Sequence, residues 1–443
     1  MPEGTGGVGP WGRALAMARE TPAARNRYVD FLRAASILVV VLGHWLMAAP
    51  RVTAEGATLG HMLDLAPWTR WLTWALQVMP TFFLVGGFAN ATSWVSARGK
   101  GRSYGEWLYS RTVRLIGPIL PLLVVWTLLA VAARLGGVGL GMVRIGSQVA
   151  LVPTWFLAVY LGVVLLVPWT WAAWRRWGLI SFVVPLLASA AVDWWGLARG
   201  HAWIRWTNYA FVWVAVHQLG YAWKEGRLRG AKAGLGWAVG GLALAAALVG
   251  WGAYPISMVG VPGQEISNTL PPTLALLAFA CFQVGLVLAL EGPARRWLED
   301  ERMWAATVLV NASIMTLYLW HSTVLVLVIG ALVKLGGPGL GLAPGTAAWW
   351  WARIPWVACL ALLLWPFLAL FGRFERSASG AAPPTWRLIA GSLALCGGIG
   401  LLSLLGIAAD NALGLSPYVA LPLAGAVLAG LHGRAAARQD GPG

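Results

Sequence analysis

Charged residues are scarce in this chain: Asp, Glu, Lys and Arg make up only 11% of its 443 residues. A soluble globular protein carries about 25% charged residues. The hydrophobic content of 59% agrees with this shortage. The composition excludes an ordinary soluble domain, and it predicts an all-α, polytopic integral membrane protein whose main partner is the lipid bilayer.

Cysteine and acidic residues are also rare. The three cysteines, Cys281, Cys359 and Cys396, fall in apolar segments without the spacing of a metal site or a disulfide framework. We therefore expect small core residues and no bound metal. The sixteen Asp and Glu residues lie almost wholly in loops, with Asp193 as the main exception. Because proton-coupled transporters place carboxylates within their spans, this distribution argues against that class.

Basic residues are in excess and give a formal net charge of +16. They sit in short loops between apolar segments, as the positive-inside rule requires, so nucleic acid is excluded as a partner. When successive loops alternate sides from a cytoplasmic N-terminus, 24 of the 32 Lys and Arg residues fall inside and 8 outside. This bias predicts a multi-pass protein of the cell (plasma) membrane with cytoplasmic N- and C-termini.

Apolar segments predict about twelve transmembrane helices. Their approximate limits are 31–49, 71–95, 115–133, 153–171, 179–196, 206–223, 233–251, 272–290, 305–333, 349–371, 387–408 and 417–432. A change in composition at the small-residue and proline linker divides them into ten spans and a final pair. The expected divisions are a flexible basic cytoplasmic tail (1–27), a ten-helix core (28–376), the linker (377–386), a C-terminal transmembrane pair (387–432) and a cytoplasmic tail (433–443).

The first span carries an arginine and a histidine at a specific spacing. Arg33 and His44 are eleven residues apart in RAASILVVVLGHW, which is about 16 Å along a helix and nearly the same face. A buried neutral histidine can accept a proton as a general base. Asp30 could pair with Arg33 at i,i+3 and orient it, or it could simply be a helix-start carboxylate. Arg33 could equally be a positive-inside anchor, and His44 a polar residue satisfied by a neighbouring helix.

Further candidates lie in later segments. Arg111 and Arg114 in YSRTVRLIGP are one turn apart and, with Arg33, could form a cytoplasmic phosphate-binding patch; the positive-inside rule also explains them. His321, about sixteen residues along its span, is predicted to lie at the depth of His44, although an isolated satisfied histidine fits as well. We interpret His217 as a structural histidine whose hydrogen bonds are satisfied within the protein, without a role in chemistry.

Two other segments allow a functional and a structural interpretation. MPTFFLVGGFANATSW (79–94) has adjacent glycines and Asn90 within a span, which suits either a ligand or close helix packing. The outer loop VPGQEISNTLPPT (261–273) could receive a hydroxylated acceptor, or it could be an ordinary solvated loop.

The segment YVDFLRAASILVVVLGH resembles the first helix of the membrane acyltransferase-3 family. In that family a D-G-L-R element is followed by ten residues and a histidine. Asp30, Leu32, Arg33 and His44 match this pattern, and Phe31 stands where glycine is common. The spacing of Arg33 and His44 is the most specific part of the resemblance.

Four other segments resemble family elements in the expected order. MPTFFLVGGF is similar to FF-x-x-SGF, with Gly86 in place of the serine. SRTVRLIGP is similar to RR-x-x-R-[LI]-x-P; Arg111 and Arg114 fit, one arginine is missing and Pro118 comes one residue late. PTWFLAVYL (153–161) and LYLWHSTVL resemble the W-F-L and L-x-H elements, and the resemblance as a whole covers about 27–371.

The resemblance implies transfer of an acyl group, usually acetyl, from cytoplasmic acyl-CoA to a hydroxyl group. The acceptors in the family are commonly carbohydrates, such as surface polysaccharides or peptidoglycan, or glycosylated secondary metabolites. Arg33, Arg111 and Arg114 would bind the donor, which in this family is usually acetyl-CoA, with no metal required. His44 would be the general base, and His321 a second polar catalytic group near the acceptor.

A secondary transporter of a small anionic or hydroxylated solute is the main alternative, because twelve spans with both ends inside also fit that class. Such transporters are built from two repeated halves. Here the connection between the sixth and seventh segments is short and the halves are not alike. A non-catalytic membrane scaffold is the third hypothesis. The sequence favours the acyltransferase.

Overall fold

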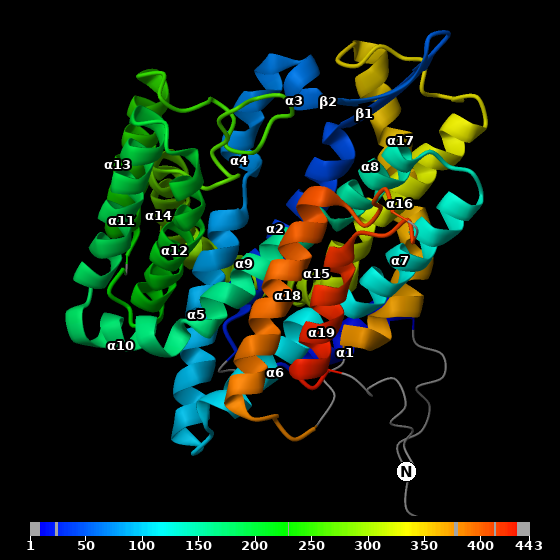
Figure 1. Cartoon of the computed structure of the whole chain (residues 1–443). Coiled ribbons are helices and arrows are strands. Elements are labelled where there is room, and N and C mark those ends of the chain that lie inside the picture. Colours follow the sequence, from blue (N-terminus) through cyan, green and yellow to red (C-terminus); the bar gives the residue numbers. More distant parts are fainter. Residues whose placement is uncertain (1–8, 23–24, 229, 376–379, 412, 432–443) are drawn as a thin grey trace, which may run out of the picture. The chain divides into compact units, whose positions relative to one another are not determined.

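The computed structural model describes residues 9–22, 25–228, 230–375, 380–411 and 413–431, which are mostly helical (Figure 1). Within these residues, eight helices are long and apolar enough to cross a membrane, or ten if each of two bent helix pairs is one span. The predicted all-α, polytopic membrane architecture is confirmed. The remaining two of the twelve predicted segments are helical but shorter, in α12 (Asn208–Lys224) and in Pro417–Leu428.

The chain divides into two compact units. The first holds the described parts of Met1–Thr92, Trp169–Ile314 and Ala331–Cys359; the second holds those of Ser93–Pro168, Met315–Gly330 and Leu360–Gly443. Four helices contribute residues to both units: α5 (Met79–Gly99), α10 (Val167–Trp177), α16 (Ile314–Lys334) and α17 (Ala347–Phe371).

The first unit holds the beginning of the chain and its middle. Its elements are α1 (Pro10–Arg19), α2 (Arg27–Met47), β1 (Ala48–Thr53), β2 (Gly56–His61), α3 (Met62–Leu65), η1 (Pro67–Leu72), α4 (Thr73–Leu76), α11 (Ile180–Asp193), the π-helical turn η2 (Trp194–Ala198), η3 (Ala202–Thr207), α12, α13 (Ala231–Gly250), α14 (Leu274–Trp297) and α15 (Glu301–Ala312). Helices α11 to α14 form a group of neighbours, coloured green in Figure 1.

The second unit contains the third and fourth predicted spans and the C-terminal pair. Its elements are α6 (Tyr104–Ile116), α7 (Ile119–Leu135), α8 (Leu140–Leu151), α9 (Thr154–Leu165), η4 (Gly372–Glu375), α18 (Thr385–Leu405), η5 (Pro417–Val419) and α19 (Ala420–Leu428). Helix α18 packs on α9, where Cys396 Sγ lies 3.1 Å from Ala158 O. Arg144 of α8 donates from Nε to Leu405 O, 3.1 Å away. The predicted C-terminal tail (433–443) lies outside the described residues, as does part of the predicted linker.

Helix α2 is continuous from Arg27 to Met47, so the predicted first span exists as one rod. The side chain of Asn26 accepts a hydrogen bond from Val29 N, 3.3 Å away, and caps the N-terminus. The helix ends at Ala48, where the chain enters an antiparallel hairpin that pairs Ala48 with His61. This hairpin, β1–β2, has no counterpart among the predicted elements.

Prolines break two predicted spans. The third is bent by 40° between α6 and α7, at Pro118. The fourth begins earlier than predicted, with α8, and bends by 46° at Pro153 before α9. A proline lacks the N–H of the helical ladder and its ring clashes with the preceding turn, so a bend at these positions has a direct steric cause.

The predicted single span over 305–333 is wrong, because the helix is interrupted at Ser313 (φ −135°, ψ 29°) between α15 and α16. Asn311 and Ser313 have side chains that compete with the helical backbone for hydrogen bonds. His321 is therefore the eighth residue of α16, and not sixteen residues along one continuous helix.

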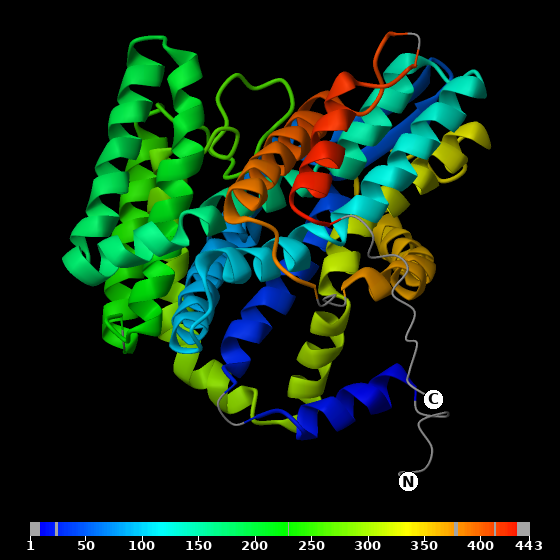
Figure 2. The ribbon, with the colours of Figure 1, turned by 60° about the horizontal axis from the view of Figure 1, so that its bottom comes forward.

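The expectation of a flexible N-terminal tail is wrong for residues 10–19. These residues form α1, which packs on α15 (Figure 2). Ala14 is fully buried, and Trp304 lies in the same apolar cluster. Arg19 Nε donates to Glu301 Oε1 at 2.7 Å. A short helix can hold this position because small alanine side chains let it approach α15 closely.

Helices α13 and α14 are held at very short range by glycines. A Cβ built on Gly241 would overlap Phe282 N of α14, and one built on Gly234 would lie 2.7 Å from Ala289 N. The neighbouring Gly240 has nothing within 4 Å of such a Cβ. In lipid the hydrophobic effect does not drive helices together, so association depends on close packing. Small residues favour it because they allow the two backbones to meet.

We expect Gly241→Ala to lower the stability by about 1–3 kcal/mol, because the added methyl group must push two backbones apart. The adjacent Gly240→Ala is the matched control, and it should leave the stability unchanged or slightly higher because alanine favours helix. Thermal unfolding of the detergent-purified variants measures both. Equal melting temperatures for the two variants would contradict the packing argument.

Candidate functional site

The guanidinium of Arg33 is held by two neighbours in the first unit. Its Nε and Nη2 donate to Asn311 Oδ1 at 2.9 and 2.7 Å, and Nη2 also donates to Asp30 Oδ1 at 3.1 Å. Arg25 Nε donates to the other oxygen of Asp30 at 2.6 Å. Asp30 thus bridges two arginines, one of them at the i,i+3 spacing on its own helix.

Asn311 is the residue that fixes this cluster in place. Its Nδ2 donates to Asp30 O at 3.0 Å and to Thr307 O at 2.9 Å, while its Oδ1 accepts hydrogen bonds from the Arg33 guanidinium. Two arginines and one carboxylate leave a net positive charge. The Arg33 side chain remains 30% exposed and that of Asp30 12%. The cluster is therefore an oriented, reachable cation of the kind that binds phosphate.

His44 lies near the other end of α2, with its side chain partly exposed. The next residue, Trp45, is buried, and its carbonyl accepts a hydrogen bond from Trp356 Nε1 of α17 at 3.2 Å. One turn farther on, Ala48 pairs with His61, which lies close enough to His44 for their charges to interact. Burial lowers the pKa of His61, partly opposed by the Asp64 carboxylate, so that His61 is a neutral neighbour.

A buried arginine lies beyond Trp356. The guanidinium of Arg353 lies over two indoles, with its central carbon 4.2 Å from the centre of the Trp349 ring and 4.9 Å from that of the Trp356 ring. The residue is 5% exposed. Its Nε and Nη1 are buried and have no hydrogen-bond partner within the described residues.

In the second unit, Arg111 and Arg114 lie one turn apart on α6. Arg111 is half-buried and stacks on Trp107 at 6.0 Å, whereas Arg114 is exposed. The charge of Arg114 acts on Glu375, whose carboxylate accepts a hydrogen bond from Thr316 N at 2.7 Å. Glu375 therefore caps the N-terminus of α16.

His321 of the second unit is fully buried on α16. Its Nδ1 lies 2.6 Å from Tyr318 O, and its Nε2 lies 3.1 Å from Ser322 Oγ. Because a carbonyl can only accept, Nδ1 carries a proton. Both ring nitrogens of His321 thus have partners, and the imidazole is held in one orientation. Its predicted match in depth to His44 rested on a continuous helix over 305–333, and that helix is interrupted.

His217 and the two-glycine segment of α5 form one packing unit. His217 is buried, and its Nε2 lies 3.1 Å from Asn90 Nδ2. A Cβ on Gly87 would overlap His217 O, and one on Gly220 would overlap Leu84 O, so α5 and α12 meet backbone to backbone. The structural interpretation of Gly87 thus has a direct steric basis.

The loop between α13 and α14 is held from inside. Asn268 is fully buried and donates to Pro255 O and Ser257 O at 2.8 and 2.9 Å. Thr269 Oγ1 donates to Met258 O at 2.8 Å, so both residues serve the loop itself. Gln264 and Glu265 are exposed.

A buried carboxylate anchors the same loop. Asp193 accepts from Asn208 Nδ2 at 2.8 Å, from Tyr254 OH at 3.0 Å and from Leu274 N at 2.7 Å. Burial and the Asp193 charge raise the pKa of Tyr254, so that its phenol stays protonated and donates. The acidic residue that the sequence places within a span is therefore engaged in holding the loop to α11, α12 and α14.

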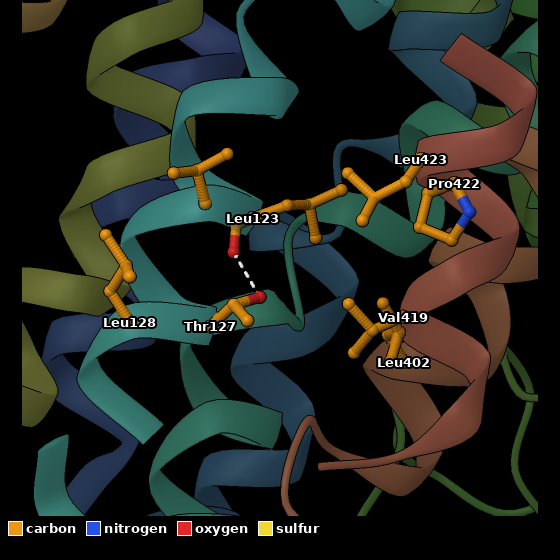
Figure 3. A pocket seen from close by; sticks show the side chains of 8 residues that line it. Leu123, Thr127, Leu128, Leu402, Val419, Pro422 and Leu423 are labelled. Carbon is orange, nitrogen blue, oxygen red and sulfur yellow. Dashed lines mark hydrogen bonds between the residues drawn. The ribbon is translucent and has the colours of Figure 1, made fainter. Parts of the chain in front are cut away.

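Two cavities in the described residues are apolar. One, of about 130 Å³, lies between α7 and the C-terminal pair and is lined by Leu123, Thr127, Leu402 and Pro422, among others (Figure 3). The hydroxyl of Thr127 donates to Leu123 O at 2.7 Å within its own helix. The other, of about 500 Å³, is an open groove formed by α11, α13 and α14. Neither offers a general base for acyl transfer.

The described residues contain no group of three or more His, Cys, Asp or Glu side chains that could hold a metal ion. In the first unit, Arg33 and its cluster lie near the start of helix α2, and His44 lies near the end of the same helix. The geometry so far defines a polytopic membrane protein with polar groups at two levels of its first span.

The model of the acyltransferase-3 family, described as an acyltransferase domain, matches residues 26–370. The match covers well over half of the chain, and the chain belongs to this family of membrane acyltransferases. No curated protein and no solved structure gives a significant match to it. The matched region begins just before α2 and ends within α17, so the C-terminal pair lies outside it.

The structure adds residues that sequence reasoning missed. Asn311 and Arg25 join the Arg33 cluster from sites 278 residues downstream and 8 residues upstream in the chain. His61 and Arg353 are near α2 only because the hairpin and α17 fold back toward it. The sequence analysis counts Arg353 among the eight basic residues on the outer side, and no local pattern distinguishes it from the others. An Asn within a predicted span was the one available signal for Asn311.

We expect Asn311→Ala to lower the stability by about 1.5–3 kcal/mol, because it removes hydrogen bonds to the charged Arg33. Asn311→Asp separates the two roles of the amide and should recover only part of the loss. Its carboxylate can still accept hydrogen bonds from both nitrogens of Arg33, but it can no longer donate to Asp30 O and Thr307 O. Thermal unfolding in detergent measures both. An Asn311→Ala protein that melts with the wild type would show that the cluster contributes nothing to the fold.

Proposed function

We propose that this membrane acyltransferase transfers an acyl group, acetyl in the first instance, from cytoplasmic acyl-CoA to a hydroxyl group of a sugar, a cell-surface glycan or a secondary metabolite. The observation that supports this proposal is that Arg33 and His44 lie on one continuous helix, eleven residues apart. That spacing places a cation and a base about 16 Å apart along the helix axis.

Arg33 is the proposed donor-binding residue. Coenzyme A carries a diphosphate and a further phosphate, and its pantetheine arm is long and thin. An oriented guanidinium with a neighbouring second arginine suits the phosphates. The arm can then extend along α2 toward His44. Asp30 is an orienting residue in this proposal, since it holds Arg33 and Arg25 at once.

His44 is the proposed general base. Its imidazole takes the proton of the acceptor hydroxyl as the oxygen attacks the thioester carbonyl carbon. A new C–O bond forms and the carbonyl oxygen becomes an oxyanion. When the C=O bond re-forms, the C–S bond breaks, and the coenzyme A thiolate leaves and takes up the proton from His44. The products are the ester and free coenzyme A, with no net change in protons.

The second unit contributes further proposed residues. Arg111 and Arg114 are proposed as donor-binding cations, and His321 as a second polar group near the acceptor. Its Nε2 lies 3.1 Å from Ser322 Oγ. We also propose that the protein resides in the plasma membrane with both termini in the cytoplasm, as the 24 basic residues on one side and 8 on the other favour.

We expect coenzyme A to raise the melting temperature of the detergent-purified wild type and to have a much smaller effect on Arg33→Ala. A ligand at 100 times its Kd adds about 2.7 kcal/mol to the folded state, which a melting curve detects. Arg19→Ala is the matched control, because it removes an exposed cation that contacts neither Asp30 nor Asn311. An equal coenzyme A shift in wild type and Arg33→Ala would assign Arg33 to anchoring alone.

We expect His44→Ala to lower the rate of acyl transfer by about 10²–10⁴-fold, the usual contribution of a general base. Coenzyme A binding and the melting temperature should change little. His201→Ala serves as the control, because it removes an exposed imidazole that stacks on Trp195. Release of coenzyme A thiol from acetyl-CoA in the presence of acceptor is the measurement. Undiminished turnover by His44→Ala would eliminate the general-base role.

A further inference from the structure

Arg353 occupies an unusual position for a cation in a membrane helix. It lies in the first unit on α17, is 5% exposed, and has its guanidinium carbon over the rings of two tryptophans, Trp349 and Trp356. Stacking on indole contributes about 0.5–2 kcal/mol per ring. That stabilisation offsets only part of the cost of removing a charge from water. Within the described residues, Arg353 forms no ion pair that would supply the counter-charge a stable buried cation needs.

The unpaired groups around Arg353 share one property, which is that they all donate. They are Arg353 Nε, Arg353 Nη1 and the adjacent Trp349 Nε1, and each is buried without a hydrogen-bond partner within the described residues. A bound water could accept from them, but it would bring two hydrogens of its own that need acceptors. A carboxylate or phosphate group only accepts and also supplies the missing negative charge.

The position of these donors relative to the proposed base is set by Trp356. One face of this indole stacks on Arg353, and its Nε1 donates to the carbonyl of Trp45, the residue after His44. The other indole, Trp349, packs on Ala49 of β1 and Met62 of α3, directly after α2. The Arg353 site is therefore built on the end of α2 that carries His44, whereas the proposed coenzyme site is at Arg33.

We propose that Arg353 binds a negatively charged group, a carboxylate or a phosphate, on the hydroxylated acceptor. This inference rests on the proposed function, because it assigns the charge of the acceptor whose hydroxyl His44 would activate. Binding energy from a group remote from the reacting hydroxyl would orient that hydroxyl for attack. The acceptor class is then an acidic sugar or a sugar phosphate, and not a neutral sugar.

The test is thermal unfolding of the full-length protein in detergent with three probes of matched shape: D-glucuronate, glucose 1-phosphate and D-glucose. We expect the two anionic sugars to stabilise the wild type and glucose to have no effect. Arg353→Gln should weaken the apparent affinity for both anions about tenfold or more. Arg199→Gln, which removes an exposed arginine stacked on Trp194, is the control and should retain both shifts.

Coenzyme A is included in every melting series to separate this inference from the proposed function. A coenzyme A shift without any shift from the anionic sugars would overturn the inference and leave the proposed function standing. Loss of the coenzyme A shift in wild type would count against the proposed function itself. If Arg353→Gln fails to fold, the wild-type contrast between glucuronate and glucose decides the question, and equal responses overturn the inference.

A lipid headgroup is the other source of a phosphate. The series is therefore repeated in nanodiscs of phosphatidylcholine and of phosphatidylglycerol. Shifts from the anionic sugars that persist in both lipids support an acceptor site. If phosphatidylglycerol alone stabilises the wild type relative to Arg353→Gln, and the sugars add nothing, the site binds lipid and the acceptor assignment is overturned.

Discussion

The unbroken hydrogen-bond ladder of α2 is the constraint on which the rest of this protein depends. In a bilayer each backbone N–H and C=O group must be paired within the protein, so a span of 21 residues becomes a rigid rod. Any two side chains on such a rod have a fixed separation. Arg33 and His44 therefore keep their spacing without help from a loop, and neighbouring elements need only orient the two ends. Asn311 orients one end, while the hairpin and α17 surround the other.

A buried polar group is costly because it loses its hydrogen bonds to water. In this structure several such groups are paired with one another in clusters. Asp193 is satisfied by an amide, a phenol and a backbone N–H, and Asp30 by two arginines. His217 and Asn90 are paired across two helices that meet through Gly87. Where a cluster is complete, it holds elements together. Arg33 differs because it stays partly exposed. Arg353 differs because two of its buried nitrogens have no acceptor within the described residues, a property that it shares with Arg205.

The sequence predicts local features of this molecule well and long-range ones poorly. Hydrophobic runs predict where most of the membrane helices lie, because the bilayer permits little else, but not where they bend or break. The Arg33–His44 spacing is a property of a single helix. The motif identified the family from residues within that helix. The pairing of Arg33 with Asn311 joins residues 278 positions apart, and no periodicity reports it. The break at Ser313 could not be read from hydropathy either, since α15 and α16 are both apolar enough to be read as one span.

The same distinction explains why the proposed donor end is recognisable in the sequence and the proposed acceptor end is not. The proposed donor, coenzyme A, has a fixed shape, so a cation and a base at a fixed spacing on one helix would suit it, and this pattern is visible in the sequence. The proposed acceptor site is assembled from separate elements, namely the end of α2, the β1–β2 hairpin and α17, which pack together in the structure. From the sequence alone, Arg353 near the start of α17 is indistinguishable from a cation that anchors a helix at the membrane interface. Only its burial against two indoles, with donors that no described residue accepts from, distinguishes it from one.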